Sequence, residues 1–129
     1  NVKRQDEIIT AVDFPIIDGW QGYSKVGVRN AMVISVASAC LVADHKSGDV
    51  RLALGSVGPT IIRCRETEQW LKDNTSLTRN SVISPDIARE FGARASRECS
   101  PIDDHRSTAQ YRRHAISILA ARLLQKAYS

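Results

Sequence analysis

Two apolar stretches separated by a polar turn form the clearest pattern in the chain. Residues 31–43 are apolar or small on both alternating faces, and residues 50–57 continue an extended pattern. A run of this kind is also compatible with a buried helix. Residues 44–49 between the two stretches are polar and include a glycine, which favours a β-hairpin. The small side chains of the first stretch predict that a helix packs closely against it.

The segment that precedes this hairpin predicts one more strand and a loop. Residues 7–14 are rich in β-branched side chains and are followed by Pro15, which is typical of an edge or connecting strand. Residues 18–22 contain two glycines. Since glycine permits the backbone conformations of tight turns, we expect a loop there.

Helical signals dominate the second half of the chain. Residues 65–72 predict a short helix, and residues 74–84 are polar and irregular. Ser84 followed by Pro85 predicts a helix start, because serine caps a helix well and proline suits the first helical position. We expect this second helix to run to about Arg97.

The last helix is predicted from its capping residues and its periodicity. Ser107 and Gln110 have the spacing of a capping box. The apolar side that follows is formed by Tyr111, Ala115, Ile118, Leu119 and Leu123. The opposite, polar side is assigned to Arg112, Arg113, Gln125 and Lys126. An amphipathic helix of about six turns is therefore expected at the end of the chain.

This order of elements predicts the fold class. Strands come first and helices afterwards, in a chain of 129 residues that suits a single domain, residues 1–129. Such an order favours an α+β domain over an alternating α/β one. We expect a small antiparallel sheet of about three strands with the helices packed on one face.

Composition excludes several classes of protein. No apolar run approaches the roughly 20 residues that a membrane span needs, and the N-terminus lacks the pattern of a signal peptide. Cys40, Cys64 and Cys99 are odd in number and far apart, which favours reduced thiols in a cytoplasmic protein. The net charge of +4 and the aromatic content of 5% are low for a nucleic-acid-binding surface. We therefore expect neither nucleic acid nor a membrane as a partner.

Catalytic and metal-binding patterns do not emerge from the residues alone. His45, His105 and His114 lack metal-ligand spacing, and the cysteines form no CxxC pair. No phosphate-binding or nucleophile motif is present. Asp103 and Asp104 are adjacent carboxylates, but they lie where acids that cap a helix belong. Residue patterns by themselves predict an α+β domain with no catalytic residues and no metal site.

Four stretches in order resemble one known family. They are residues 7–12 before Phe14-Pro15, residues 23–31 (Y-x-K-x-x-x-R-x-A), residues 51–60 (R-x-A-L-G-[SG]-V-x-P-T) with Arg63 and Glu68 beyond them, and residues 104–113 (D-x-R-[SA]-x-A-x-Y-R-R). Together they are similar to the C-terminal domain of the FAD-binding medium subunit of molybdenum hydroxylases. Xanthine dehydrogenases and carbon monoxide dehydrogenase are members of this family.

The resemblance implies a role in electron transfer. In such enzymes a large subunit oxidises substrate at a molybdopterin cofactor, and a small subunit passes electrons through 2Fe-2S clusters. FAD in the medium subunit then delivers the electrons to NAD or another acceptor. The chain lacks an initiator Met and the family's glycine-rich FAD loops. We therefore expect a fragment that is inactive alone and binds FAD weakly or not at all by itself.

The resemblance also implies roles for particular residues. Lys25 is expected beside the isoalloxazine ring, where a positive charge stabilises the reduced, anionic flavin. Arg29 is expected to add positive field or to contact a neighbouring subunit. Tyr111 and Arg112 are expected to be architectural, and Arg106 to pair with Asp103 or Asp104. Two alternatives stay open: a non-catalytic domain for subunit assembly, and a basic nucleic-acid-binding module.

Overall fold

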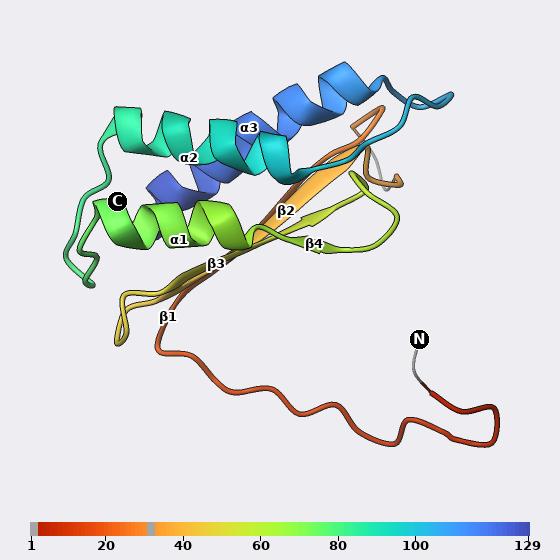
Figure 1. Ribbon diagram of the computed structural model, residues 1–129, viewed down its shortest axis with the longest axis horizontal. Helices are drawn as coiled ribbons and strands as arrows, with labels where there is room; N and C mark the ends of the chain where they lie inside the picture. Colours follow the sequence, from red (N-terminus) through yellow and green to blue (C-terminus); the bar gives the residue numbers. More distant parts are fainter. Residues whose placement is uncertain (1–2, 31–32) are drawn as a thin grey trace.

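The computed structural model describes residues 3–30 and 33–129, which form an antiparallel sheet with three helices on one face (Figure 1). The elements are β1 (Gly19–Val26), β2 (Ala37–Asp44), β3 (Val50–Gly55), β4 (Ile62–Arg63), α1 (Arg65–Asn74), α2 (Pro85–Glu98) and α3 (Ala109–Ala127). The strand order β1-β2-β3-β4 follows the chain. The predicted α+β class and the one-sided packing of the helices are confirmed. The described residues form four strands, where about three were expected.

The predicted hairpin is confirmed as β2 and β3, joined by the polar turn. Within the turn, the Asp44 carboxylate accepts the backbone N–H of Lys46 at 2.9 Å and that of Ser47 at 3.3 Å. Gly48 has a φ of +76°, a conformation that glycine adopts without the steric cost other residues incur. Residues 31 and 32, which were predicted to begin the first strand of the hairpin, lie outside the described residues.

Two predictions for the N-terminal part are wrong. Residues 7–14 form no strand, and residues 19–26, half of which overlap the predicted loop, form β1. Residues 7–14 do carry strand-forming side chains, but a strand also requires a partner, and no described residue pairs with them. Their apolar side chains are accordingly exposed, with Ile8 at 86% and Phe14 at 80%.

The glycines of β1 explain why a loop was expected. A Cβ atom at Gly19 would lie 1.8 Å from the carbonyl oxygen of Ala43 on the neighbouring strand. A Cβ atom at Gly22 would lie 2.0 Å from the ring of Trp20. Glycine within a strand often marks such a close approach. Here it serves packing between β1, β2 and the Trp20 ring.

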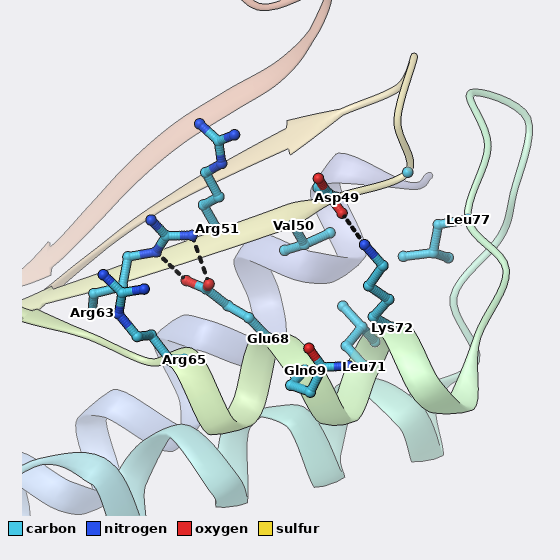
Figure 2. A pocket seen from close by; sticks show the side chains of 11 residues that line it. Asp49, Val50, Arg51, Arg63, Arg65, Glu68, Gln69, Leu71, Lys72 and Leu77 are labelled. Atoms are coloured by element: carbon cyan, nitrogen blue, oxygen red, sulfur yellow. Dashed lines mark hydrogen bonds and ion pairs between the residues drawn. The ribbon is translucent and has the colours of Figure 1, made fainter.

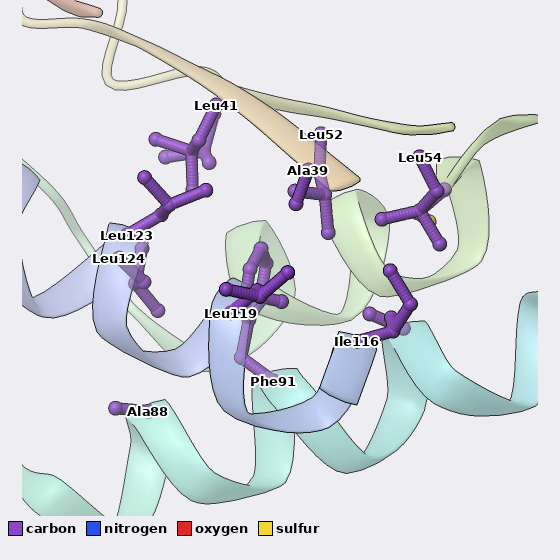
Figure 3. Packing of buried hydrophobic residues seen from close by; sticks show 14 of the residues in the cluster. Ala39, Leu41, Leu52, Leu54, Ala88, Phe91, Ile116, Leu119, Leu123 and Leu124 are labelled. Carbon is purple, nitrogen blue, oxygen red and sulfur yellow. The ribbon is translucent and has the colours of Figure 1, made fainter. Parts of the chain in front are cut away.

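The core lies between the inner face of the sheet and the helices (Figure 3). Alternate residues of β2 and β3 point inward, because successive side chains of a strand lie on opposite faces. The fully buried side chains include Leu41, Leu52 and Leu54 from the sheet, and Phe91, Ile116 and Leu124 from the helices. Each contributes roughly 1.5–3 kcal/mol on burial. Ala37 and Ala39 are the small residues that let α3 approach β2 closely, as predicted.

Both long helices begin with a hydroxyl side chain as the cap, but only one cap was predicted correctly. Ser84 caps α2 as predicted, since its side chain accepts the N–H of Ile87 and Pro85 is the first helical residue. The predicted capping box of α3 is wrong, because Thr108 caps that helix. Ser107 is already bonded back to Asp104 through its backbone N–H. The cap is consequently Thr108, one residue after the predicted Ser107.

The crossing of α2 and α3 depends on Gly92. A Cβ atom there would lie 2.0 Å from the backbone oxygen of Ser117 on α3 and 3.2 Å from the side chain of Ala121. The clash involves backbone, which cannot rotate away as a flexible side chain can. The two helices must separate to accept even one methyl group.

We therefore expect Gly92→Ala to lower the free energy of unfolding by about 3 kcal/mol, at the upper end of overpacking costs. Chemical denaturation of the wild type and the variant measures the difference. Arg89→Ala, at an exposed site on the same helix, is the control and should change stability by less than about 0.5 kcal/mol. Equal stabilities for Gly92→Ala and the wild type would contradict the close crossing.

Candidate functional site

The outer face of the sheet is free of helices and carries mixed chemistry. In β1, Gln21, Tyr23 and Lys25 are exposed while their neighbours along the strand are half-buried. The register places Cys40 of β2 opposite Tyr23, and Ser38 opposite Lys25. All three helices lie on the other side of the sheet (Figure 1). This outer face thus presents a phenol, an ammonium group and a thiol side by side.

Lys25, the main candidate from sequence, is held at the end of β1. Its Nζ atom donates a hydrogen bond to the carbonyl oxygen of Val33 at 2.9 Å. The backbone N–H of Val36 donates to the carbonyl oxygen of Val26 at 2.7 Å, which joins the ends of β1 and β2. Arg29 is exposed in the connection between these strands. Both predicted residues thus belong to the same end of the sheet, opposite the β2–β3 turn.

Two open cavities lie at this end of the sheet. The first has a volume of about 550 Å³ and is lined by Val28, Arg29, Val33, Ile34, His105 and Arg106. The second has a volume of about 530 Å³, and its lining includes Ile34, Ser56, Pro59, Asp104, Arg106 and Arg112. They share Ile34 and Arg106, so they form one hollow region with a basic rim. Three of the four motif stretches found in the sequence come together here or border it.

A buried arginine joins two of these stretches to the start of β2. Arg112 is 5% exposed, and its Nη1 donates to the carbonyl oxygens of Val36 at 2.7 Å and Ser56 at 2.8 Å. Its Nη2 donates to the carboxylate of Asp104 at 2.7 Å. Ser56 has a φ of +64°, so its carbonyl belongs to a tightly bent turn. We call this set of contacts the Arg112 network.

The Arg112 network corrects two predictions. Arg112 was assigned to the polar side of the last helix, but it lies on the buried side. Arg106 was expected to pair with an aspartate, yet Asp104 pairs with Arg112 and receives only the backbone N–H of Arg106. The capping role is confirmed for Asp103, which accepts the N–H of Ala109. A signal was available: Arg112 precedes buried Ala115 by three residues, so a charge lay within the apolar stripe.

The hydrogen bonds at Asp104 also affect its acidity. The backbone N–H of Arg106, the guanidinium of Arg112 and the backbone N–H of Ser107 hold the pKa of Asp104 at about 2. Its ordinary value is 3.8. Each of these donors stabilises the charged carboxylate more than the neutral acid. Asp104 therefore stays ionised, and the charge of Arg112 stays neutralised, at any pH near neutrality.

A second basic pocket is explained by internal ion pairs. Figure 2 shows this cavity of about 270 Å³ between β3 and α1. Arg63 donates to both carboxylate oxygens of Glu68, at 2.7 and 2.8 Å, and the backbone N–H of Leu52 donates to the same group at 2.8 Å. Lys72 pairs with Asp49 at 2.9 Å. Glu68 thus fastens α1 to β4 through Arg63 and to β3 through Leu52, which explains why Arg63 and Glu68 continue the sequence motif.

Of the three cysteines only Cys40 lies on the outer face, and Cys64 and Cys99 are buried. Burial raises the pKa of the Cys64 thiol to about 12, and burial also raises the pKa of Cys99. Cys40 is the one exposed thiol of the three. Within residues 3–30 and 33–129, no group of three or more His, Cys, Asp or Glu side chains is arranged to hold a metal ion. The helices of the described part of the chain are too short or too polar to span a membrane.

The fold and these motif-bearing turns define a C-terminal domain of flavoproteins. The chain belongs to the family described as CO dehydrogenase flavoprotein C-terminal domain, whose model matches residues 23–127. The glyceraldehyde dehydrogenase medium chain of Sulfolobus acidocaldarius is 25% identical over 126 residues, which are 95% of this chain and 42% of that protein. The putative xanthine dehydrogenase FAD-binding subunit of Escherichia coli is 27% identical over 131 residues, which are 96% of this chain and 42% of that protein.

A further relative and two solved structures agree. The nicotine 6-hydroxylase medium subunit of Paenarthrobacter nicotinovorans is 29% identical, over 95% of this chain and 41% of its own length. Quinoline 2-oxidoreductase from Pseudomonas putida 86 superposes with a TM-score of 0.73 at 18% identity, over 88% of this chain and 38% of that one. A carbon monoxide dehydrogenase from Hydrogenophaga pseudoflava superposes with a TM-score of 0.68 at 24% identity, over 85% of this chain and 36% of that one. The chain thus spans about two fifths of the curated relatives it matches.

The acidity of Asp104 gives a pH-dependent prediction. Because its folded-state pKa lies below the ordinary value, the carboxylate stabilises the fold above pH 3.8, and this contribution is lost as the pH falls through about 2. Asp104→Asn should therefore be less stable than the wild type above pH 3.8, and the difference should shrink towards pH 2. Urea denaturation across this range measures it. Asp13→Asn, on the exposed N-terminal segment, is the control; a difference independent of pH at position 104 would contradict the assignment.

Proposed function

We propose that the chain is the C-terminal domain of the FAD-carrying subunit of a molybdenum hydroxylase-type oxidoreductase. In this proposal the subunit takes electrons from iron–sulfur clusters and passes them through FAD to NAD or another acceptor. The observation that supports it most is the convergence of three motif stretches of a flavoprotein family at one end of the sheet. The names of the relatives, among them an FAD-binding subunit and two medium subunits or chains, agree with it.

The described residues suit one edge of a flavin rather than the whole cofactor. Lys25 offers an exposed ammonium group that a carbonyl oxygen already orients. Residues 3–30 and 33–129 contain no glycine-rich loop at a helix N-terminus that would hold a pyrophosphate. The proposal therefore places the pyrophosphate site in another part of the subunit. Bound FAD would supply the redox chemistry, and Lys25 would stabilise negative charge on the reduced ring.

The outer face of the sheet suits contact with the flavin-binding part of the same subunit. Tyr23 is 61% exposed there, and Ile34 at the neighbouring cavity is 64% exposed. Large apolar groups left in water favour an interface. The partners implied for the complete enzyme are a molybdopterin-binding large subunit and a 2Fe-2S small subunit. A domain for assembly alone would use the same face, but the midpoint potential of the flavin would then not depend on Lys25.

Replacing Lys25 by methionine separates these two functions. In the complete FAD-containing subunit, Lys25→Met should lower the flavin midpoint potential by on the order of tens of millivolts, because a nearby positive charge favours the anionic reduced ring. Spectroelectrochemical titration measures this potential. Lys46→Met, which removes an exposed lysine at the opposite end of the sheet, is the matched control. If the two variants give equal potentials, Lys25 has no role at the flavin.

The thiol of Cys40 reports on the proposed interface. In the complete subunit Cys40 should react with iodoacetamide much more slowly than a cysteine introduced by Arg89→Cys on the helical side. Peptide mass spectrometry follows each site separately, so other cysteines do not interfere. Rapid labelling of Cys40 in the folded, FAD-loaded subunit would show that the outer face is uncovered and would contradict the proposed contact.

A further inference from the structure

We propose that Arg112 is a positioning residue for Lys25. Its guanidinium holds residues 33–36, to which the Lys25 side chain is hydrogen-bonded. It therefore sets where the ammonium group of Lys25 lies at the flavin. This inference rests on the proposed function, because it assumes that Lys25 lies beside the flavin. Arg112 itself is buried in the core and is not offered as a group that touches the cofactor.

The first step concerns the peptide group of Val36. Its carbonyl oxygen accepts a hydrogen bond from Arg112 at 2.7 Å, and its N–H donates to the carbonyl oxygen of Val26 at 2.7 Å. Val26 is the residue directly after Lys25 on β1. One peptide group therefore connects the guanidinium to the strand end that carries the lysine.

The second step concerns the lysine side chain. Its Nζ atom donates to the carbonyl oxygen of Val33, three residues before Val36. Three residues span at most about 10 Å of extended chain, so the position of Val36 limits where the Val33 carbonyl can lie. The backbone and the side-chain tip of Lys25 are thus both tied to the segment that Arg112 holds.

The third step concerns what holds Arg112. Its Nη1 also bonds Ser56 at the end of β3, and its Nη2 pairs with Asp104 before α3. A planar guanidinium with several fixed donors can serve three acceptors at once, which the single ammonium of lysine cannot do with the same geometry. Replacing Arg112 by lysine keeps the positive charge but removes the planar set of fixed donors.

The test uses Arg112→Lys in the complete FAD-containing subunit, alone and together with Lys25→Met. If Arg112 acts through Lys25, Arg112→Lys lowers the flavin midpoint potential of a subunit that retains Lys25. The same change then has no further effect in the Lys25→Met background. Arg63→Lys is the matched control, since it makes the same exchange in the Arg63–Glu68 pair at the opposite edge of the sheet and should leave the potential unchanged.

Hydrogen exchange provides a readout that does not depend on the flavin. Arg112→Lys should accelerate exchange at the amide of Val36 and leave that of Leu52 protected, whereas Arg63→Lys should do the reverse. If Arg112→Lys does not fold, Asp104→Asn carries the same test in milder form, because it removes only the ionic partner of Arg112.

Each outcome decides between the two proposals. If Lys25→Met shifts the potential and Arg112→Lys does not, the positioning role is wrong and the proposed function stands. If Arg112→Lys shifts the potential equally in both backgrounds, its effect does not pass through Lys25 and the inference is also wrong. If Lys25→Met has no effect, both the flavin role of Lys25 and the positioning role of Arg112 are wrong.

Discussion

One-sided burial of the sheet is the main constraint on this fold. The helices cover a single face, where leucines of β2 and β3 meet Phe91 and the apolar side of α3. Burying this interface satisfies the hydrophobic requirement of the sheet and the helices together. The opposite face is then free to carry Tyr23, Lys25 and Cys40 without weakening the core.

The same constraint explains how ion pairs are used. Glu68 and Asp104 each accept a backbone N–H and an arginine, and each does so where a helix meets an end or edge of the sheet. Arg63 is partly exposed, while Arg112 lies within the core. Leaving a buried guanidinium without partners costs several kcal/mol, so the Arg112 network must form whenever α3 docks. Folding of the core thereby assembles the end of the sheet that we assign to the flavin.

The sequence was most informative where structure depends on neighbouring residues. The β2–β3 turn and the Ser84 cap were predicted correctly because their hydrogen bonds lie within a few residues. The β1 glycines misled because glycine is also a turn signal, whereas here Gly19 makes room for Ala43 of the neighbouring strand and Gly22 for the Trp20 ring. The spacing of Arg112 from Ala115 indicated its buried position, but its partner Val36, 76 residues away in sequence, could not be predicted from neighbouring residues.

The candidate site was predictable only in part. The order of four motifs identified the family, which the match over residues 23–127 confirms. The structure then showed why the motifs are linked: the Arg112 network joins two of them, and Val36 of that network is hydrogen-bonded to Val26 of a third. The roles of Lys25 and Arg29 stay predictions, because they rest on the resemblance to the family and not on contacts within the described residues.

The two edge strands of the sheet differ in how readily they can pair with a strand of another molecule. β4 has only two residues, and so short an edge strand offers little template for another chain. β1 has eight residues, and its outer edge pairs with no other described strand. A charged residue on a long edge opposes strand-to-strand growth, and lysine is the residue that natural sheets use most often for this purpose. Lys25 therefore also places a positive charge on this long edge strand, where it opposes strand-to-strand association between molecules.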